Sequence, residues 1–318
     1  MYTHRNMNIV ERRAAAPVEV QPLSYALIDQ FESYIDAKPR TVNAYVSNIK
    51  RFAWYLNQEG IHSPTRQDIL DYRSYLKEHY KPATVQSYMV AVRLFFQWTE
   101  QAGLYPNVAQ RIKGATISKE HKKDHLTSGQ MQRVLDTVDR STPEGKRDYA
   151  ILALMVTGGL RGIEIHRANI EDLRTLGDST VLYIQGKGKE EKADYIKIMP
   201  VVEAALRDYI KTRGELIEGE ALFTSMSNNS KGQRLSTRSI SGIVKQRLKD
   251  AGFNSDRLTA HSLRHTAVTL SLIGGNTLQE VQQFARHGNI STTQIYAHNL
   301  DRAKNKCEET ISGSIFTQ

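Results

Sequence analysis

Apolar residues recur every three or four positions along most of the chain, which is the spacing that the buried face of an amphipathic helix requires. In the first hundred residues this pattern is bounded by Pro at helix starts and by Gly just past helix ends. It predicts four helices, at Ser24–Ala37, Pro39–Gln58, Arg66–Glu78 and Pro82–Gln101.

Two of these predicted helices carry the same apolar pattern 43 residues apart. Ile49 and Phe52 of one helix return as Val92 and Phe95 of the other. Because the repeated positions share one helical face, we expect the aromatic residues to form a core rather than a platform for stacked bases. The basic residues between them are candidates for phosphate contacts, or else belong to a solvated helix face; they are Lys50, Arg51 and Arg93.

The second half of the chain adds a different period. Thr180–Gln185 and Tyr195–Met199 read as strands, and they flank a turn rich in glycine and lysine at Gly186–Lys189. Further helices are expected at Gln130–Val138, Glu144–Val156, from Leu160, and at Val201–Arg213, Thr237–Ala251, His261–Ile273, Leu278–Arg286 and Thr292–Asn305. The predicted fold class is therefore mainly α with a small β-sheet.

A chain of 318 residues is long enough for two domains that each bury a core. We predict a polar, mobile tail at residues 1–21, a helical domain at 22–111, and a second domain at 126–318 that ends in a tail at 312–318. Residues 112–125 are basic with little apolar pattern, which predicts a linker. Its Lys122 and Lys123 are candidate DNA contacts, or simply part of a charged loop.

The net charge of +9 indicates a polyanionic partner, most often nucleic acid, although a solubilising surface is the alternative. The one cysteine, Cys307, excludes a disulfide within the chain and a metal site built on several cysteines. No apolar run approaches the roughly 18 residues of a membrane span, and the first residues lack the apolar core of a secretory signal. We therefore expect a cytoplasmic protein.

Residues 259–298 concentrate the candidate chemistry. His261 and Arg264 share a helix face, and His287 precedes Tyr296 by nine positions. Phosphoryl transfer to a hydroxyl needs cations on the phosphate oxygens, an aligned nucleophile and a proton for the leaving oxygen. Arg161 and Arg264 suit the first role. Each arginine taken singly could instead form a structural ion pair, and a single tyrosine could be an ordinary core residue.

Four segments, taken in order and spacing, resemble the tyrosine recombinase family of phage integrase and Xer-like proteins. They are Thr157–Ile165 around the first arginine, Gly186–Lys189, His261–Thr266 and His287–Tyr296. The predicted helices of residues 22–111 are similar to the SAM-like core-binding domain of that family, so the resemblance covers nearly the whole chain. It implies that residues 126–318 form a mixed α/β catalytic domain.

The resemblance implies an enzyme that breaks and rejoins DNA. Tyr296 would attack a DNA phosphate and form a 3′-phosphotyrosyl intermediate, followed by strand exchange through a Holliday junction. Arg161 and Arg264 would clamp the phosphate, and Lys187 would protonate the leaving 5′-oxygen. An exposed hairpin lysine is the alternative reading of Lys187, and Lys189 of the same turn could take its role.

The remaining residues of the set would support this reaction. His261 would assist proton transfer, His287 would hydrogen-bond the phosphate oxygens, and Glu164 would hold the site together. The covalent bond conserves the phosphodiester energy, so no cofactor is implied, and the chain contains no Walker-type phosphate loop. A metal is not expected either, because Arg264 lies between His261 and His265, the pair that could otherwise hold one.

One departure from the family pattern stands beside the site. Ala285-Arg286 precedes His287, where the family usually has Leu-Gly, and Arg286 adds charge there. The expected partners are double-stranded DNA and further copies of the chain in a tetramer on DNA. The segment after Tyr296, residues 301–318, would dock on a neighbouring subunit or on its own domain. Two alternatives share the scaffold: a non-catalytic DNA-binding protein and a nicking-closing enzyme similar to type IB topoisomerases.

Overall fold

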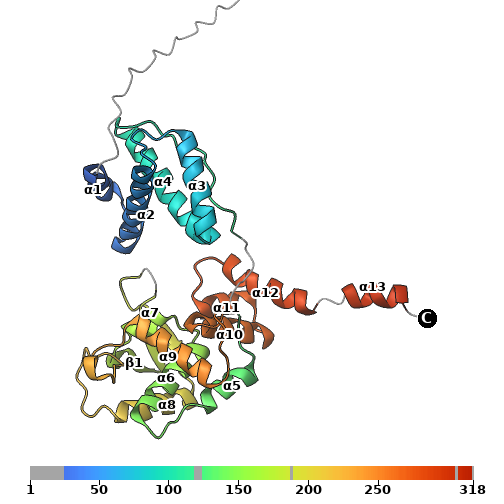
Figure 1. The fold of residues 1–318 in the computed structure, drawn as a ribbon. Helices are drawn as coiled ribbons and strands as arrows, with labels where there is room; N and C mark the ends of the chain where they lie inside the picture. Colours follow the sequence, from blue (N-terminus) through green and yellow to red (C-terminus); the bar gives the residue numbers. More distant parts are fainter. Residues whose placement is uncertain (1–24, 118–123, 187–188, 305–306, 317–318) are drawn as a thin grey trace, which may run out of the picture. The chain divides into compact units, whose positions relative to one another are not determined.

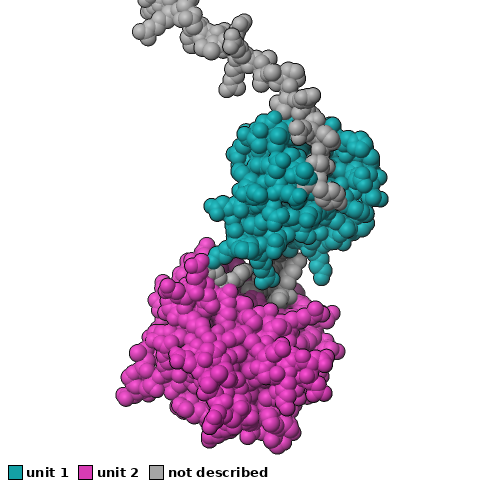
Figure 2. Space-filling view, turned by 90° about the vertical axis from the view of Figure 1, so that its left-hand side faces the viewer, with its two compact units in different colours: residues 1–119 teal, residues 120–318 magenta. Residues whose placement is uncertain are grey.

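The computed structural model describes residues 25–117, 124–186, 189–304 and 307–316. The chain divides into unit 1, Met1–Lys119, and unit 2, Glu120–Gln318, which are coloured separately in Figure 2. The predicted tail at residues 1–21, together with Lys122, Lys123 and Lys187, lies outside the described residues. Within those ranges, no helix is both long enough and apolar enough to cross a membrane.

Unit 1 is helical throughout its described secondary structure. Its elements are α1 (Tyr25–Tyr34), α2 (Pro39–Gln58), α3 (Arg66–His79) and α4 (Pro82–Gln101), labelled in Figure 1. α2 and α4 each start with a proline in the first turn, where the missing N–H costs little. Their repeated apolar positions are fully buried, and Phe95 packs edge-on against Phe31 at 5.2 Å between ring centroids. The aromatic residues thus build the core of unit 1, as the spacing predicts.

The segment that leaves unit 1 is held against α3 and α4. Arg66 donates to the carbonyl of Gln110 at 2.6 Å, and Arg93 donates to that of Ile112 at 2.9 Å. Ile112 is 2% exposed and belongs to the core of unit 1. The sequence placed the start of the linker at this residue, but its apolar side chain is buried.

Unit 2 combines packed helices with a small antiparallel sheet. The strands β1 (Leu173–Leu176), β2 (Ser179–Ile184) and β3 (Asp194–Lys197) lie in the order β1-β2-β3, with Leu182 opposite both Leu173 and Ile196. The longer helices are α5 (Ser128–Asp136), α6 (Pro143–Thr157), α8 (Pro200–Lys211), α9 (Thr237–Asp250), α10 (Ala260–Ile273) and α12 (Ser291–Lys304). The other helical elements are α7 (Gly162–Arg167), α11 (Leu278–Ala285), α13 (Cys307–Phe316) and two 3-10 turns at Ile170–Asp172 and Asn228–Ser230. The predicted fold class, mainly α with a small sheet, is confirmed.

The C-terminal segment differs from its prediction. The sequence predicted a tail from Ser312, but α13 is helical to Phe316. Its apolar side chains Ile311, Ile315 and Phe316 are 57%, 65% and 78% exposed, and Cys307 is exposed as well.

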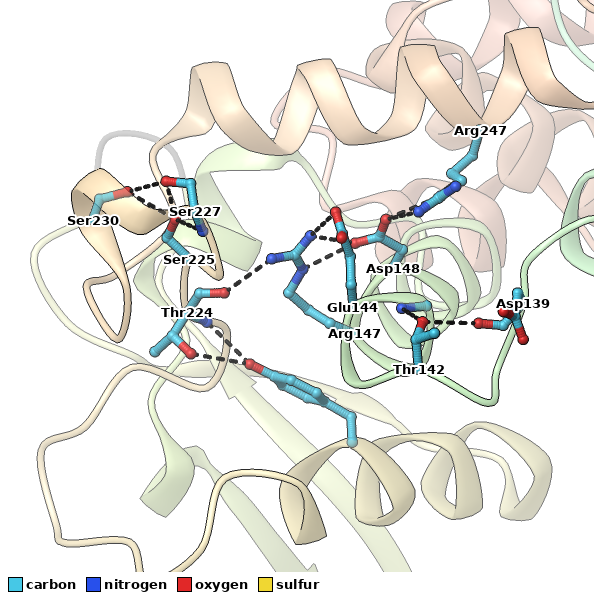
Figure 3. A network of polar contacts seen from close by, with 12 residues as sticks. Asp139, Thr142, Glu144, Arg147, Asp148, Thr224, Ser225, Ser227, Ser230 and Arg247 are labelled. Carbon is cyan, nitrogen blue, oxygen red and sulfur yellow. Dashed lines mark hydrogen bonds and ion pairs between the residues drawn. The ribbon is translucent and has the colours of Figure 1, made fainter.

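A buried ionic network joins two helices of unit 2 (Figure 3). The carboxylate of Asp148 on α6 accepts two bonds from Arg147, at 2.9 and 2.7 Å, and two from Arg247 on α9, at 3.0 and 2.7 Å. Asp148 and Arg147 are only 2% and 3% exposed. Burying a carboxylate is costly unless charged donors compensate it, and here two arginines do so.

Candidate active site

The first arginine of the site lies where α7 begins. Arg161 has extended backbone angles just before the helix, and the Glu164 carboxylate accepts its backbone N–H at 2.8 Å. The other oxygen of that carboxylate accepts from the Arg161 guanidinium, also at 2.8 Å. Glu164 is 1% exposed. One buried carboxylate therefore fixes both the helix start and the direction of the Arg161 side chain.

The second arginine comes from the buried face of α10. Arg264 is 1% exposed, and its guanidinium donates to the carbonyl of Gly159 at 2.5 Å and to that of Ala285. Burial, with the nearby charges of Arg161 and Arg286, lowers the pKa of Arg264 to about 9. Arg264 thus ties α10 to the segments before α7 and at the end of α11.

Tyr296, the candidate nucleophile, is 6% exposed on α12. Burial raises the pKa of its phenol to about 12, and the charges of Arg264 and Arg161 act in the opposite direction. The phenol is hydrogen-bonded to Nδ1 of His265 on α10. His265 in turn contacts the exposed His261 edge-on, with 4.5 Å between ring centroids.

His287 follows the end of α11 and faces the same tyrosine. Its ring is nearly parallel to that of Tyr296, at 6.3 Å between centroids, and its Nδ1 is 2.9 Å from the Thr293 hydroxyl. Burial and then the charges of Arg264 and Arg161 lower the pKa of His287 to about 4. The imidazole is therefore neutral at physiological pH and can both donate and accept a hydrogen bond.

A cleft of about 720 Å³ opens on this cluster, and Arg161, Arg286 and His287 help to line it. The turn between β2 and β3 contributes Gly186 and Lys189 to the same cleft. Lys189 pairs with Asp194 at 2.7 Å. Of the two lysines that the sequence left open for this turn, Lys189 lies in the cleft and Lys187 is outside the described residues.

The structure brings Arg161, Glu164, Arg264, His287 and Tyr296 into one cluster, with His261 attached through the ring of His265. Of the residues of unit 1 that were predicted to contact DNA, two make contacts within unit 1 and one is exposed. Arg51 donates to the Tyr80 hydroxyl at 3.0 Å and lies over the Trp54 ring, Arg93 holds the Ile112 carbonyl, and Lys50 is exposed.

Two side chains of the cluster were not assigned a role from the sequence. His265 was considered only as a partner of His261 on a metal, but it is 4% exposed on α10 and bonds Tyr296. Arg286 was noted only as an added charge. Among the described residues, no group of three or more His, Cys, Asp and Glu side chains could hold a metal ion.

Comparison with known proteins identifies the family. Residues 124–303 match the phage integrase family, and residues 27–105 match the N-terminal SAM-like domain of phage integrases. The tyrosine recombinase XerC of Pelobacter propionicus is 31% identical over 283 residues, covering 85% of this chain and 89% of the relative. A tyrosine recombinase of Synechococcus elongatus is 27% identical over 319 residues, covering 96% and 97%.

Solved structures share the fold. The XerH recombinase bound to palindromic difH substrate in a post-cleavage complex has a TM-score of 0.73 at 20% identity, over 90% of this chain and 85% of that one. A lambda integrase dimer bound to a COC′ core site has a TM-score of 0.63 at 17% identity, over 84% and 96%. The chain therefore belongs to the phage integrase family of tyrosine recombinases, enzymes that break and rejoin DNA strands.

Proposed function

We propose that the protein is a site-specific recombinase in which Tyr296 is the nucleophile. The phenol oxygen attacks a DNA phosphorus, a 3′-phosphotyrosyl bond forms, and the bond to the 5′-oxygen breaks. Attack by a 5′-hydroxyl of a second duplex reverses the step and yields a Holliday junction. The observation that carries the proposal is the packing of the Tyr296 ring beside His287, at 6.3 Å between centroids, and beside His265, which follows Arg264 on α10, at 5.3 Å.

Electrostatics support this assignment. A phenol whose pKa is near 12 is almost fully protonated at neutral pH, so the reaction needs cations that stabilise charge as it develops. Arg161 and Arg264 supply them as planar guanidinium groups suited to phosphate oxygens, and a pKa of about 9 keeps Arg264 charged at neutral pH. His287, neutral and next to the phenol ring, hydrogen-bonds a phosphate oxygen.

Proton transfer involves two further positions. The tyrosine proton leaves as the P–O bond forms, assisted by His261 on the exposed side of α10. The departing 5′-oxygen takes a proton from a lysine of the turn between β2 and β3, Lys187 or Lys189. Because one phosphodiester is exchanged for another, the reaction requires no nucleotide cofactor.

The partners follow from the same chemistry. Double-stranded DNA is the substrate, and a tetramer of the chain on two duplexes supports exchange of strands in pairs. Lys50, Arg51 and Arg93 of unit 1 contact phosphates without reading sequence. The DNA-bound states named for XerH and lambda integrase support DNA as the partner.

Covalent trapping tests the proposal. A duplex is first selected for binding from a random-sequence pool with Tyr296→Phe, then nicked so that cleavage releases a short strand and cannot be reversed. Wild type should give a protein–DNA adduct on a denaturing gel, linked at the 3′-phosphate, and Tyr296→Phe should give none. DNA binding without an adduct from wild type would favour the non-catalytic alternative. Strand joining that requires only one site would favour the nicking-closing alternative.

A further inference from the structure

Arg286 has an unusual backbone conformation for its residue type. It ends α11 with φ 53° and ψ 46°, in the left-handed region. Among the described residues, nine of the eleven with positive φ are glycine, and the other two are Arg111 and Arg286. Glycine adopts this conformation without steric cost, whereas an arginine is strained there. Strained residues cluster at functional sites, so this conformation beside the candidate active site indicates a function for the Arg286 side chain.

The side chain of Arg286 turns inward to the carboxylate that orients Arg161. Only 12% of it is exposed. Its guanidinium donates to Glu164 at 3.1 Å, to the Gly159 carbonyl at 3.1 Å and to the Phe284 carbonyl at 2.7 Å. Its buried Nε has no hydrogen-bond partner within the part of the chain that the structure describes. These contacts hold the Arg286 guanidinium against Glu164, and the Arg286 carbonyl accepts from the Arg161 guanidinium at 3.4 Å.

The two arginines use different oxygens of one carboxylate. Oε1 of Glu164 accepts from the Arg161 guanidinium, and Oε2 accepts from Arg286 and from the Arg161 backbone. A carboxylate held at both oxygens cannot rotate away from either partner. Arg286 therefore adds a third bond to a carboxylate that Arg161 already holds through its guanidinium and its backbone N–H, and this bond restrains Glu164 when the Arg161 guanidinium turns to a phosphate.

The charges of the candidate active site also support a role for Arg286. Arg161, Arg264 and Arg286 bring three positive charges, and Glu164 neutralises one of them. Without Arg286, a single positive charge would remain uncompensated within this group of residues. A DNA phosphodiester carries one negative charge, and the reacting group gains more as the phenol loses its proton and forms the P–O bond. Two uncompensated charges match that change better than one.

We propose that Arg286 is a positioning residue of the active site: it holds Glu164 so that Arg161 faces the attacked phosphate, and it keeps the site at two uncompensated positive charges. This role rests on the proposed function of Tyr296. The Arg286 side chain acts on the reaction indirectly, through its hydrogen bond to Glu164 and through its positive charge.

The matched variants are Arg286→Gly and Arg111→Gly. Both replace an arginine in the left-handed region by the residue that fits it best, but Arg111 is exposed in unit 1. Arg286→Lys keeps the charge and loses the planar fork. Each protein is checked for folding by circular dichroism and for binding to the selected duplex. The rate of adduct formation is then measured on the nicked duplex, with the cleaved phosphate mapped from the wild-type product.

The deciding comparison uses a duplex whose cleaved phosphate is replaced by an uncharged methylphosphonate. On the normal phosphate, Arg286→Gly should be slower than wild type by about 10-fold or more, with Arg286→Lys between them and Arg111→Gly unchanged. On the methylphosphonate, the ratio of wild type to Arg286→Gly should shrink to about 2-fold, because the missing cation faces less negative charge.

A residue that only ends α11 would give a different result. Its loss would slow both substrates by the same factor, and that outcome would overturn the proposal, as would a wild-type rate for Arg286→Gly on the normal phosphate. If Arg286→Gly fails to fold, the same comparison is made with Arg286→Asn, which also removes the charge and is tolerated in the left-handed region, and equal ratios on the two substrates would again overturn the proposal. Absence of any adduct from wild type would instead reject the proposed function, and the role of Arg286 with it.

Discussion

Asp148 offers a test of how much a buried carboxylate stabilises unit 2. It receives four hydrogen bonds from two arginines and is 2% exposed. Asp148→Asn removes the negative charge and leaves the side chain of Arg147, which is 4% exposed, with Glu144 as its remaining ion-pair partner among the described residues, at 3.5 Å and 62% exposed. Breaking one partner of a buried ion pair costs about 3–5 kcal/mol. With a urea dependence of about 2 kcal/mol per molar, the unfolding midpoint of unit 2 should fall by about 2 M.

Asp250 provides the matched control. It bonds the same Arg247 at 3.1 Å, but its side chain is 34% exposed. A pair open to solvent contributes at most about 1 kcal/mol, so Asp250→Asn should lower the midpoint by less than about 0.5 M. Both variants keep nearly the same side-chain volume, and they differ mainly in burial.

The assay can separate the two units. Both tryptophans of the chain, Trp54 and Trp98, lie in unit 1, so tryptophan fluorescence reports on unit 1 and far-ultraviolet circular dichroism on both units. Asp148→Asn should add an early transition by circular dichroism and leave the fluorescence midpoint unchanged. Equal effects of the Asp148 and Asp250 variants would refute the argument from burial. A fluorescence midpoint that moves with the first transition would refute independent unfolding of the units.

Three further substitutions test the candidate active site and the hydrophobic core of unit 1. Arg161→Ala should slow adduct formation on the order of 100-fold while much duplex binding remains, and a wild-type rate would remove Arg161 from the site. The lowered pKa of His287 means that the unfolded chain binds its proton more readily. The contribution of neutral His287 to the free energy of unfolding is therefore fully present above about pH 6.5 and is lost as the pH falls toward 4. Before solvent screening is considered, this contribution is at most about 3 kcal/mol. His287→Gln should flatten the fall in urea midpoint between pH 7 and 5, and an unchanged slope would contradict the burial of the ring. Phe95→Ala should destabilise unit 1 by about 3–5 kcal/mol, seen as an earlier fluorescence transition with the second unit unaffected.

Much of the fold could be predicted because its helices carry strong periodicity and clear end signals. The boundaries predicted for Pro39–Gln58 and Pro82–Gln101 are those of α2 and α4. β1 was not predicted, because its four residues are mostly exposed and carry no alternation of buried and exposed positions. Residues 312–316 of α13 were predicted as part of a tail, since the glycine and serines there obscure a helical pattern that buries no side chain among those described.

The candidate site was predicted in its parts but not in its connections. The spacing of His261, Arg264, His287 and Tyr296 pointed to one cluster, residue chemistry added Arg161 as a second candidate phosphate ligand, and the resemblance to a family joined them in one site. Spacing along the chain could not show that Glu164 lies between two arginines, because Arg286 reaches it from a segment 122 positions away. Nor could it show that the tyrosine bonds His265, since that contact depends on how α12 packs against α10.

The exposed Cys307 on α13 has a consequence for studying assembly. It is the sole thiol of the chain, so any disulfide that forms must join two separate copies. Mild oxidation followed by non-reducing electrophoresis would thus report directly when the α13 helices of two molecules meet. A thiol-reactive dye would likewise attach at one known position of the unaltered sequence, just beyond the segment that carries Tyr296.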